Sequence, residues 1–321
     1  LWKERSPAAI SVGVAPERNR NGGSGLRAVF ALPALTGNIG PVGSGVCDVS
    51  GFFPVDSETL GRPDLRRAPV REFNVLDIPR HILDPGAERP IKAVCIYNHN
   101  PVAVHPRARE MQAALQQEEL FVVGSEVSKT DSMAYCDVIL PAASHLEYGD
   151  LYTAYGHHYL QRSAPAFPPV GESLPNTEIF RRLAARFGFE EDCFGDSDDT
   201  LMDQALPADE GVVQGLRPSE LPLDQALEMP GGQSLLRDLP PATPSGRIEL
   251  FSESLEASRG QGLPQYRELE EPRSFILVSP ASEHRINSTL GGIEGHDRDL
   301  NCEMHPDDAD RHGLSDGQQV R

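Results

Sequence analysis

The sequence is poor in basic residues and lacks any long apolar run. Lysine and arginine together number 29 against 48 acidic residues, so the formal net charge is −19. A chain this acidic repels phosphate backbones, which excludes nucleic-acid binding through a basic surface. No stretch reaches the roughly 18 consecutive apolar residues that a membrane-spanning helix needs, so we expect no direct insertion into a bilayer.

Cysteines are few and widely separated. They stand at Cys47, Cys95, Cys136, Cys193 and Cys302. An odd number at such spacing predicts neither a disulfide framework nor a C-x-x-C metal site. The first three lie in apolar stretches, where a reduced cysteine packs as a small hydrophobic side chain. We therefore interpret these cysteines as packing residues.

The glycine-rich segments lack the spacing of phosphate-binding loops. Glycines between positions 22 and 45 match neither the G-x-G-x-x-G fingerprint nor the P-loop. The 29 glycines and 28 prolines show no period and 39% of the residues are apolar, which excludes collagen, coiled coil and wholesale disorder. With 321 residues and no internal repeat, the chain has material for about two domains.

Short apolar segments alternate with helical patterns in the first 145 residues. Strands are predicted at 8–14, 93–97, 120–123 and 138–141, and helices at 26–35 and from Pro106 to about 115. This alternation is typical of a parallel α/β sheet. Because ligands bind beyond the carboxyl ends of parallel strands, we expect the loops 13–25, 98–101 and 124–132 to converge on one crevice.

The pattern changes in the second half of the chain. A helix is predicted at 176–188, ended by Gly188. Residues 190–245 are rich in Asp, Glu, Gly and Pro with little periodicity and are expected to form a surface excursion or a tie between domains. A new strand is predicted at 274–279. The last residues, after the turn at Asp316-Gly317, only begin another strand, so we expect an internal piece of a longer protein.

Two polar segments follow predicted strands and are candidate ligand sites. Asn98-His99-Asn100-Pro101 offers two amides, each with a donor and an acceptor, although a plain Asx turn has the same composition. Residues 279–289 gather hydroxyls, an imidazole, an amide and Arg285, whose guanidinium can hold a phosphate in a fork. A polar loop without a ligand is the alternative for this second segment.

Taken in order, seven stretches resemble the large catalytic subunit of the molybdopterin oxidoreductases of the dimethyl sulfoxide reductase family. The stretches are 16–23 (PERNRNGG), 32–40 (LPALTGNIG), 97–101 (YNHNP), 130–142 (TDSMAYCDVILPA), 243–250 (TPSGRIEL), 279–289 (SPASEHRINST), and 305–309 (HPDDA) with 313–317 (GLSDG). No single stretch is diagnostic, but their order follows the family across nearly the whole chain.

The resemblance implies an α/β fold class and a division into three parts. Residues 1–145 are expected to be the second half of a parallel-sheet domain that binds a molybdopterin guanine dinucleotide. Residues 146–272 are expected to connect this half to other domains of the parent protein. Residues 273–321 are expected to begin a C-terminal β-barrel of the double-psi type.

The resemblance also implies a cofactor and its contacts. The family binds molybdenum or tungsten through two molybdopterin guanine dinucleotides. One guanosine diphosphate arm is expected to contact Asn98, Asn100 and Asp137, while Glu126 is expected to hold a ribose hydroxyl. The expected contacts to pterin and phosphate are Ser279, His284, Arg285, Asn287 and Ser288.

The activity implied by the resemblance is two-electron redox chemistry, by oxygen-atom or hydride transfer. The family's [4Fe–4S] cysteines and its metal-ligating residue would precede Leu1, so we expect no catalytic residue and no metal ligand here, and no turnover by this chain alone. An iron–sulfur electron-transfer subunit or domain is the expected partner. The alternative is a cofactor-free scaffold, such as the large iron–sulfur subunit of respiratory NADH dehydrogenase, which would not need the polar clusters near positions 98–100 and 284–288.

Overall fold

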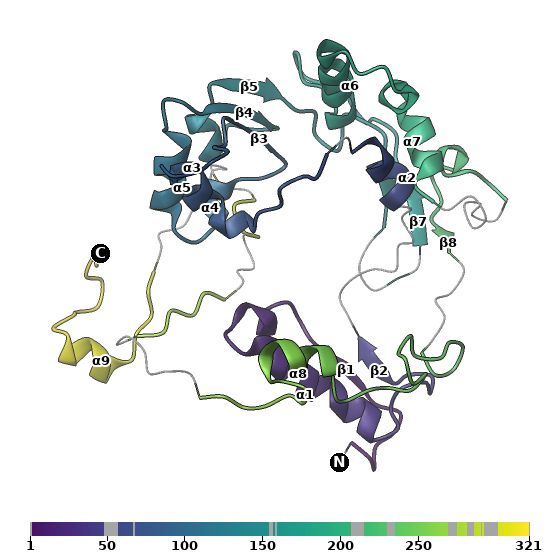
Figure 1. Cartoon of the computed structure of the whole chain (residues 1–321), viewed down its shortest axis with the longest axis vertical. Coiled ribbons are helices and arrows are strands. Elements are labelled where there is room, and N and C mark those ends of the chain that lie inside the picture. The colour runs from purple at the N-terminus through teal and green to yellow at the C-terminus, as the bar shows by residue number, and fades with distance from the viewer. Residues whose placement is uncertain are drawn as a thin grey trace. The chain divides into compact units, whose positions relative to one another are not determined.

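The chain forms two compact units in the computed structural model (Figure 1). One unit combines residues 1–72 with 141–276, and the other combines residues 73–140 with 277–321. The structure describes residues 2–47, 57–66, 68–153, 157, 159–206, 215–229, 235–268, 275–280, 286–289, 291 and 301–320. The predicted domain boundaries after 145 and 272 stay a prediction.

The second unit is built around a three-stranded sheet. Its strands are β3 (Ala93–Tyr97), β4 (Phe121–Glu126) and β5 (Val138–Pro141), in the order β3-β4-β5. β3 and β4 are parallel, with Ala93 opposite Phe121 and Tyr97 opposite Ser125. The strands predicted at 93–97, 120–123 and 138–141 are therefore confirmed, as is the parallel α/β class.

Short helices make the connection between β3 and β4. They are α4 (Pro101–Val104) and α5 (Ala108–Leu115), and α3 (Ile78–Leu83) packs against α5. Met111, Ala114 and Leu115 of α5 are buried, but the helix begins two residues after Pro106, because Arg107 takes a left-handed conformation (φ 63°) at its N-cap. The buried core of this unit comprises Ile96, Val102, Met111, Leu115, Leu120, Val122 and Met133.

The first unit opens with a separate two-stranded parallel sheet. Strand β1 (Ala9–Ser11) pairs with β2 (Gly45–Cys47), and α1 (Gly22–Leu35) connects them. Pro33 lies in the last turn of this helix, two positions before its end, so its missing N–H leaves the Val29 carbonyl without its usual helical hydrogen bond. Because β1 pairs with β2, it shares no sheet with β3. Loop 13–25 therefore does not extend from the sheet edge that carries loops 98–101 and 124–132, and its convergence with them on one crevice stays a prediction.

A small antiparallel sheet and two further helices also belong to the first unit. Strand β7 (Tyr159–Arg162) lies between β6 (Leu151–Tyr152) and β8 (Leu227–Glu228). The helices are α6 (Asn176–Phe187) and α7 (Asp198–Gln204). Gly188 ends α6 at φ 72°, which confirms the predicted stop.

The segment 190–245 contributes core residues, contrary to the prediction of a surface excursion. Leu206, Leu221, Leu227 and Met229 are buried together with Leu160 of β7. These apolar residues are too far apart in sequence to show a period, yet β8 and the turns around it fold them onto one strand. The interpretation of 190–245 as irregular surface chain was therefore wrong.

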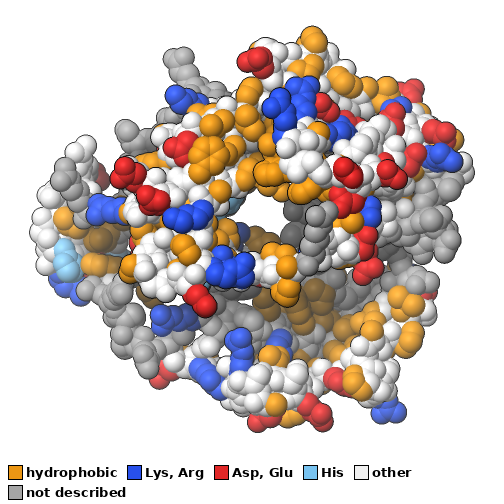
Figure 2. All heavy atoms as spheres, turned by 45° about the horizontal axis from the view of Figure 1, so that its top comes forward, with side chains coloured by type: hydrophobic (Ala, Val, Ile, Leu, Met, Phe, Trp, Pro, Cys, Tyr) orange, Lys and Arg blue, Asp and Glu red, His pale blue; other side chains and the backbone are white. Residues whose placement is uncertain are grey.

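The remaining helices are short. They are α2 (Ser57–Gly61), α8 (Glu253–Arg259) and α9 (Pro306–Arg311). Basic side chains lie among acidic ones on the face shown in Figure 2. In the part of the chain that the structure describes, no helix has the length and apolar character needed to cross a bilayer.

Residues 275–280 follow an irregular path, so the strand predicted at 274–279 does not form across its described part. Ile276, Leu277 and Val278 are 80%, 87% and 77% exposed. Strand propensity alone does not form a strand, because the backbone groups also need a neighbouring strand to pair with. The C-terminal β-barrel stays a prediction.

Candidate cofactor site

Strands β3 and β4 end at the same edge of their sheet. Tyr97 lies opposite Ser125, so Asn98 and Glu126, the residues that follow this pair, lie at one edge. Asn98 takes a left-handed conformation (φ 52°), which asparagine tolerates better than most residues because its short polar side chain can bond locally. The chain thus turns sharply as it leaves β3.

The side chain of Asn100 joins the two loops at this edge. Its Oδ1 accepts hydrogen bonds from the Ser132 backbone N–H (3.1 Å) and the Ser132 hydroxyl (2.7 Å), and its Nδ2 donates to Asp131 Oδ2 (3.3 Å). Ser132 Oγ in turn accepts from the Val102 N–H at 3.1 Å. Loops 98–101 and 124–132 therefore meet as predicted. With Asn100 only 6% exposed, its amide positions the loops from inside the protein.

Asp137 lies near the opposite end of β4. Its backbone N–H donates to the Val122 carbonyl (2.8 Å), and its Oδ2 accepts from the Val122 N–H (2.7 Å). Val122 is the second residue of β4 and Glu126 the last, which separates them by about 13 Å at the usual rise of a strand. The structure therefore does not bring Asp137 together with Asn98 and Glu126, because Asp137 precedes its strand whereas the other two stand at the ends of theirs.

Two buried hydroxyls at the carboxyl edge have no hydrogen-bond partner among the described residues. They are Ser125 Oγ, near the end of β4, and Thr130 Oγ1, in the loop that follows. A buried polar atom without a partner costs about 1–3 kcal/mol. Glu126 beside them uses Oε1 to accept from the Val127 N–H (2.9 Å). The edge thus combines a carboxylate with two hydroxyls that have no partner in the described part of the chain.

A pair of histidines beside this edge was not singled out as a site by the sequence. His99 Nε2 and His105 Nε2 lie 2.8 Å apart, and the ring centroids are separated by 4.8 Å. Burial, and then the neighbouring His99, lower the pKa of His105 below its ordinary value of 6.5. The sequence does show that His99 and His105 flank a segment long enough for one helical turn, α4. Their spacing alone does not show that the rings meet.

Cys136 packs as predicted, whereas Cys47, Cys95 and Cys302 are exposed, so the prediction that the cysteines pack in the interior is wrong for these three. A Cβ atom added to Gly124 would lie 2.7 Å from Cys136 Sγ and 2.3 Å from Met133 Sδ, so both sulfur atoms press against the strand at that glycine. Burial is the main cause that raises the pKa of the Cys136 thiol. A thiol held neutral and in contact with Gly124 is a packing group.

The C-terminal candidate residues are only partly described. Ser279 and Asn287 are exposed and Ser288 is half-buried, whereas His284 and Arg285 lie outside the described residues. Asn287 takes a left-handed conformation (φ 52°) in a turn that the Thr289 N–H closes by donating to the Ile286 carbonyl. The predicted role of this segment stays a prediction.

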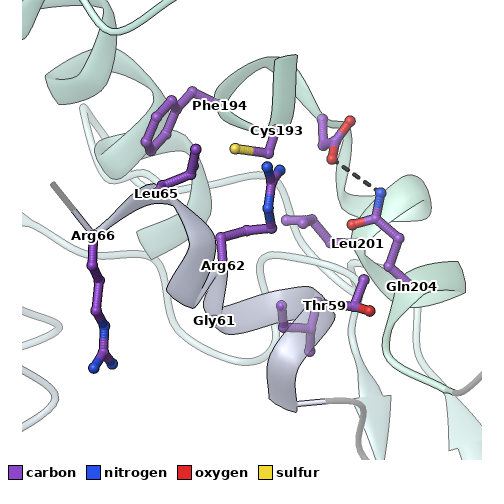
Figure 3. A pocket seen from close by; sticks show the side chains of 11 residues that line it. Thr59, Gly61, Arg62, Leu65, Arg66, Cys193, Phe194, Leu201 and Gln204 are labelled. Carbon is purple, nitrogen blue, oxygen red and sulfur yellow. Dashed lines mark hydrogen bonds between the residues drawn. The ribbon is translucent and has the colours of Figure 1, made fainter. Parts of the chain in front are cut away.

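A separate cavity lies in the first unit between α2 and α7 (Figure 3). Its volume is about 360 Å³, and it contains none of the predicted site residues. Arg62 donates to Asp64 through Nε (2.9 Å) and Nη2 (2.8 Å), and this pairing lowers the pKa of the Asp64 carboxyl. Gln204 donates to Asp196 at 3.1 Å. Both carboxylates near the cavity thus have protein partners, and we assign it no ligand.

The chain is similar to known redox enzymes. Residues 2–186 match the family model for molybdopterin oxidoreductases. The chain is 34% identical to Probable oxidoreductase YoaE of Bacillus subtilis (strain 168), covering 100% of this chain and 48% of that protein. It is 25% identical to the dimethyl sulfoxide/trimethylamine N-oxide reductase of Rhodobacter capsulatus, covering 94% of this chain and 41% of that protein. The chain thus spans less than half the length of these relatives.

A solved structure shows the same fold. Acetylene hydratase from Pelobacter acetylenicus superposes with a TM-score of 0.62 at 18% identity, over 83% of this chain and 41% of that one. At this identity the likeness shows the fold alone. Together with the family match over residues 2–186 and the relatives named as reductases, it confirms the predicted resemblance. The chain belongs to the molybdopterin oxidoreductases of the dimethyl sulfoxide reductase family.

Proposed function

We propose that this chain is part of a molybdenum or tungsten oxidoreductase that binds two molybdopterin guanine dinucleotides. The carboxyl edge of β3 and β4 would hold one guanosine diphosphate arm, with Asn98 and Glu126 as direct contacts. Asn100 would position both loops from inside the protein. Asp137 is left out of this arm because its carboxylate is bonded near the start of β4.

The observation that carries the proposal is the pair of buried hydroxyls at this edge. Ser125 Oγ and Thr130 Oγ1 lack a partner among the described residues, so a ligand with its own donors and acceptors would recover their bonding. The Glu126 carboxylate suits a ribose hydroxyl, as acidic groups do at the ends of strands in dinucleotide-binding sheets. Lys129, in the loop after β4, supplies a positive charge for a phosphate. This set of donors and acceptors fits a nucleotide.

The second set of contacts would come from residues 279–288. Ser279, Asn287 and Ser288 would bond pterin or phosphate groups, and the Arg285 guanidinium with His284 would bind a phosphate. When bound, the metal–pterin group supplies two-electron redox chemistry by oxygen-atom or hydride transfer. This chain binds and orients that group. Electrons would pass through a [4Fe–4S] centre and an iron–sulfur partner that this sequence does not contain, so the chain alone would not turn over.

The scaffold alternative is separated from this proposal by Asn98 and the two hydroxyls. The internal hydrogen bonds of Asn100 would serve a scaffold equally well, so they do not discriminate between the two functions. Ser173 Oγ of the first unit is likewise buried without a described partner, so it is the position of Ser125 and Thr130 at the carboxyl edge, beside Asn98 and Glu126, that separates the two functions. These hydroxyls favour the cofactor-binding function.

Nucleotide binding by the chain tests the proposal. We expect GDP to bind more tightly than ADP in isothermal titration calorimetry. The Asn98→Gly substitution keeps the left-handed backbone accessible and removes only the amide, so it should weaken GDP binding about tenfold, equivalent to about 1.4 kcal/mol. The matched control is Asn21→Gly, at another left-handed asparagine (φ 61°) in the other unit. Equal affinity for GDP and ADP, or an unchanged affinity in Asn98→Gly, would contradict the proposal.

A further inference from the structure

The His99–His105 contact closes the turn that follows β3. His99 lies between Asn98 and Asn100, and His105 is the C-cap of α4, where its backbone N–H donates to the Pro101 carbonyl (3.3 Å). The two rings approach through their Nε2 atoms at 2.8 Å. A hydrogen bond between side chains six residues apart therefore ties both ends of the segment 99–105 together.

This contact depends on the number of protons that the pair carries. A neutral imidazole has one N–H donor and one bare nitrogen, whereas a protonated imidazole has two donors and no acceptor. A contact of 2.8 Å between two Nε2 atoms needs one donor and one bare nitrogen. If both rings are protonated, two N–H groups and two positive charges face each other, and the contact must open.

Other charged groups of the surrounding elements hold partners of their own. At the start of α5, Arg107 lies 3.4 Å from Asp77 and 3.7 Å from Glu110. In the loop before Ser132, the Asp131 carboxylate accepts from the Asn100 amide. Arg107 and Asp131 are thus already bonded to other groups, and His99 is the neighbour whose charge lowers the pKa of the half-buried His105.

We propose that His99 and His105 are positioning residues whose shared proton keeps the Asn98–Asn100 turn in the shape that receives the guanine nucleotide. This inference rests on the proposed function of the same edge and adds its regulation. At neutral pH the pair is closed and the turn is fixed. Uptake of a second proton from solvent opens the pair, frees the turn and lowers nucleotide affinity.

The pH range in which the contact opens follows from the direction in which the pKa of His105 is shifted. Its pKa in the folded chain is lowered from 6.5, so the unfolded chain binds the proton more readily. The stabilising contribution is therefore fully present above about pH 6.5 and is lost as the pH falls below this value, through the pKa of the folded state. The contact should be closed at about pH 7.5 and should open increasingly as the pH falls below about 6.5.

Hydrogen exchange of the full chain tests the His99–His105 clasp, the hydrogen bond between the two rings, without any ligand. The amides of Ala103, Val104 and His105 donate within the turn, so their protection factors report its opening. We expect these factors to fall at least fivefold between about pH 7.5 and about pH 5.5 in the native chain. In His105→Gln, whose side chain keeps a donor and an acceptor but does not titrate, they should stay constant.

Controls separate this effect from a general loss of stability. His145→Gln, at an exposed histidine of the other unit, should keep the native pH dependence. If His105→Gln fails to fold, His99→Gln makes the same test, because either substitution leaves one titrating ring. Protection factors that do not change with pH in the native chain, or that change equally in the Gln variant, would overturn the clasp.

GDP binding then tests the link to the nucleotide. Because the terminal phosphate of GDP takes up a proton near about pH 6, the measured quantity is the difference between the native chain and His105→Gln. We expect the native chain to lose at least fivefold more affinity than the variant on acidification. Equal losses would overturn the link to the nucleotide. Absence of GDP binding at every pH would overturn the proposed function, while the exchange experiment would still decide whether the clasp exists.

Discussion

The two clusters of buried apolar residues found in the described part of the chain differ in whether polar candidate site residues lie beside them. The cluster around Leu160, Leu206, Leu221, Leu227 and Met229 contains none of the predicted site residues. The cluster around β3 and β4 ends in a polar edge, where Asn100 bonds Ser132 inside the protein and two hydroxyls lack described partners. We assign a stabilising role to the first cluster, whereas the edge beside the second cluster also carries groups that a ligand can use.

The largest effect should come from the apolar cluster. Leu160→Ala removes a side chain that is 0% exposed and leaves a cavity, so we expect a loss of about 3 kcal/mol in the free energy of unfolding. Urea unfolding followed by circular dichroism measures it, and GDP affinity in the absence of urea should not change. Leu223→Ala, at a leucine that is 55% exposed and two positions after the buried Leu221, is the control and should cost less than about 0.5 kcal/mol. Loss of GDP binding in Leu160→Ala would contradict the separation of stability from binding.

A smaller effect on stability, but a larger one on binding, is expected at the polar edge. Asn100→Ala leaves the buried N–H and hydroxyl of Ser132 without their acceptor, at a cost of about 2 kcal/mol. Since the same bonds position the loop, GDP affinity should fall as well. Ser128→Ala, at an exposed position in the neighbouring loop, should change neither quantity. An unchanged GDP affinity in a folded Asn100→Ala variant would show that the loop does not need this amide.

The smallest effect should come from the Glu147 carboxylate, which accepts hydrogen bonds from two backbone N–H groups of the first unit. The Glu147 carboxylate accepts from the N–H groups of Ser144 (2.6 Å) and Val170 (2.7 Å), which holds its pKa below the ordinary 4.5. A lowered carboxyl pKa stabilises the fold above about pH 4.5, and this contribution is lost as the pH falls through the folded pKa.

Glu147→Gln should therefore lower the thermal midpoint slightly at neutral pH and not in acid. Thermal unfolding at a series of pH values measures this difference. Glu172→Gln, at an exposed glutamate nearby, is the control. If the difference in thermal midpoint between the native chain and Glu147→Gln grew on acidification, the stabilisation would not come from the ionised carboxylate.

Much of the fold around the site could be predicted from the sequence. The strands at 93–97 and 138–141 are dense apolar runs bounded by turns, so their boundaries are visible locally. The strand predicted at 274–279 has the same kind of pattern but no pairing in its described part. The buried leucines of 190–245 were missed for the opposite reason, because their partner in β7 lies far away in the sequence.

The sequence by itself determined the α/β class, the family and the polar residues that follow β3. These features depend on local apolar patterns and on the order of short motifs. Only the tertiary structure decided that Asn100 bonds Ser132, that Asp137 lies near the start of β4, and that His99 meets His105. The physical reason is that hydrogen-bond partners depend on strand register and on how separate segments pack, and a local pattern of residues encodes neither.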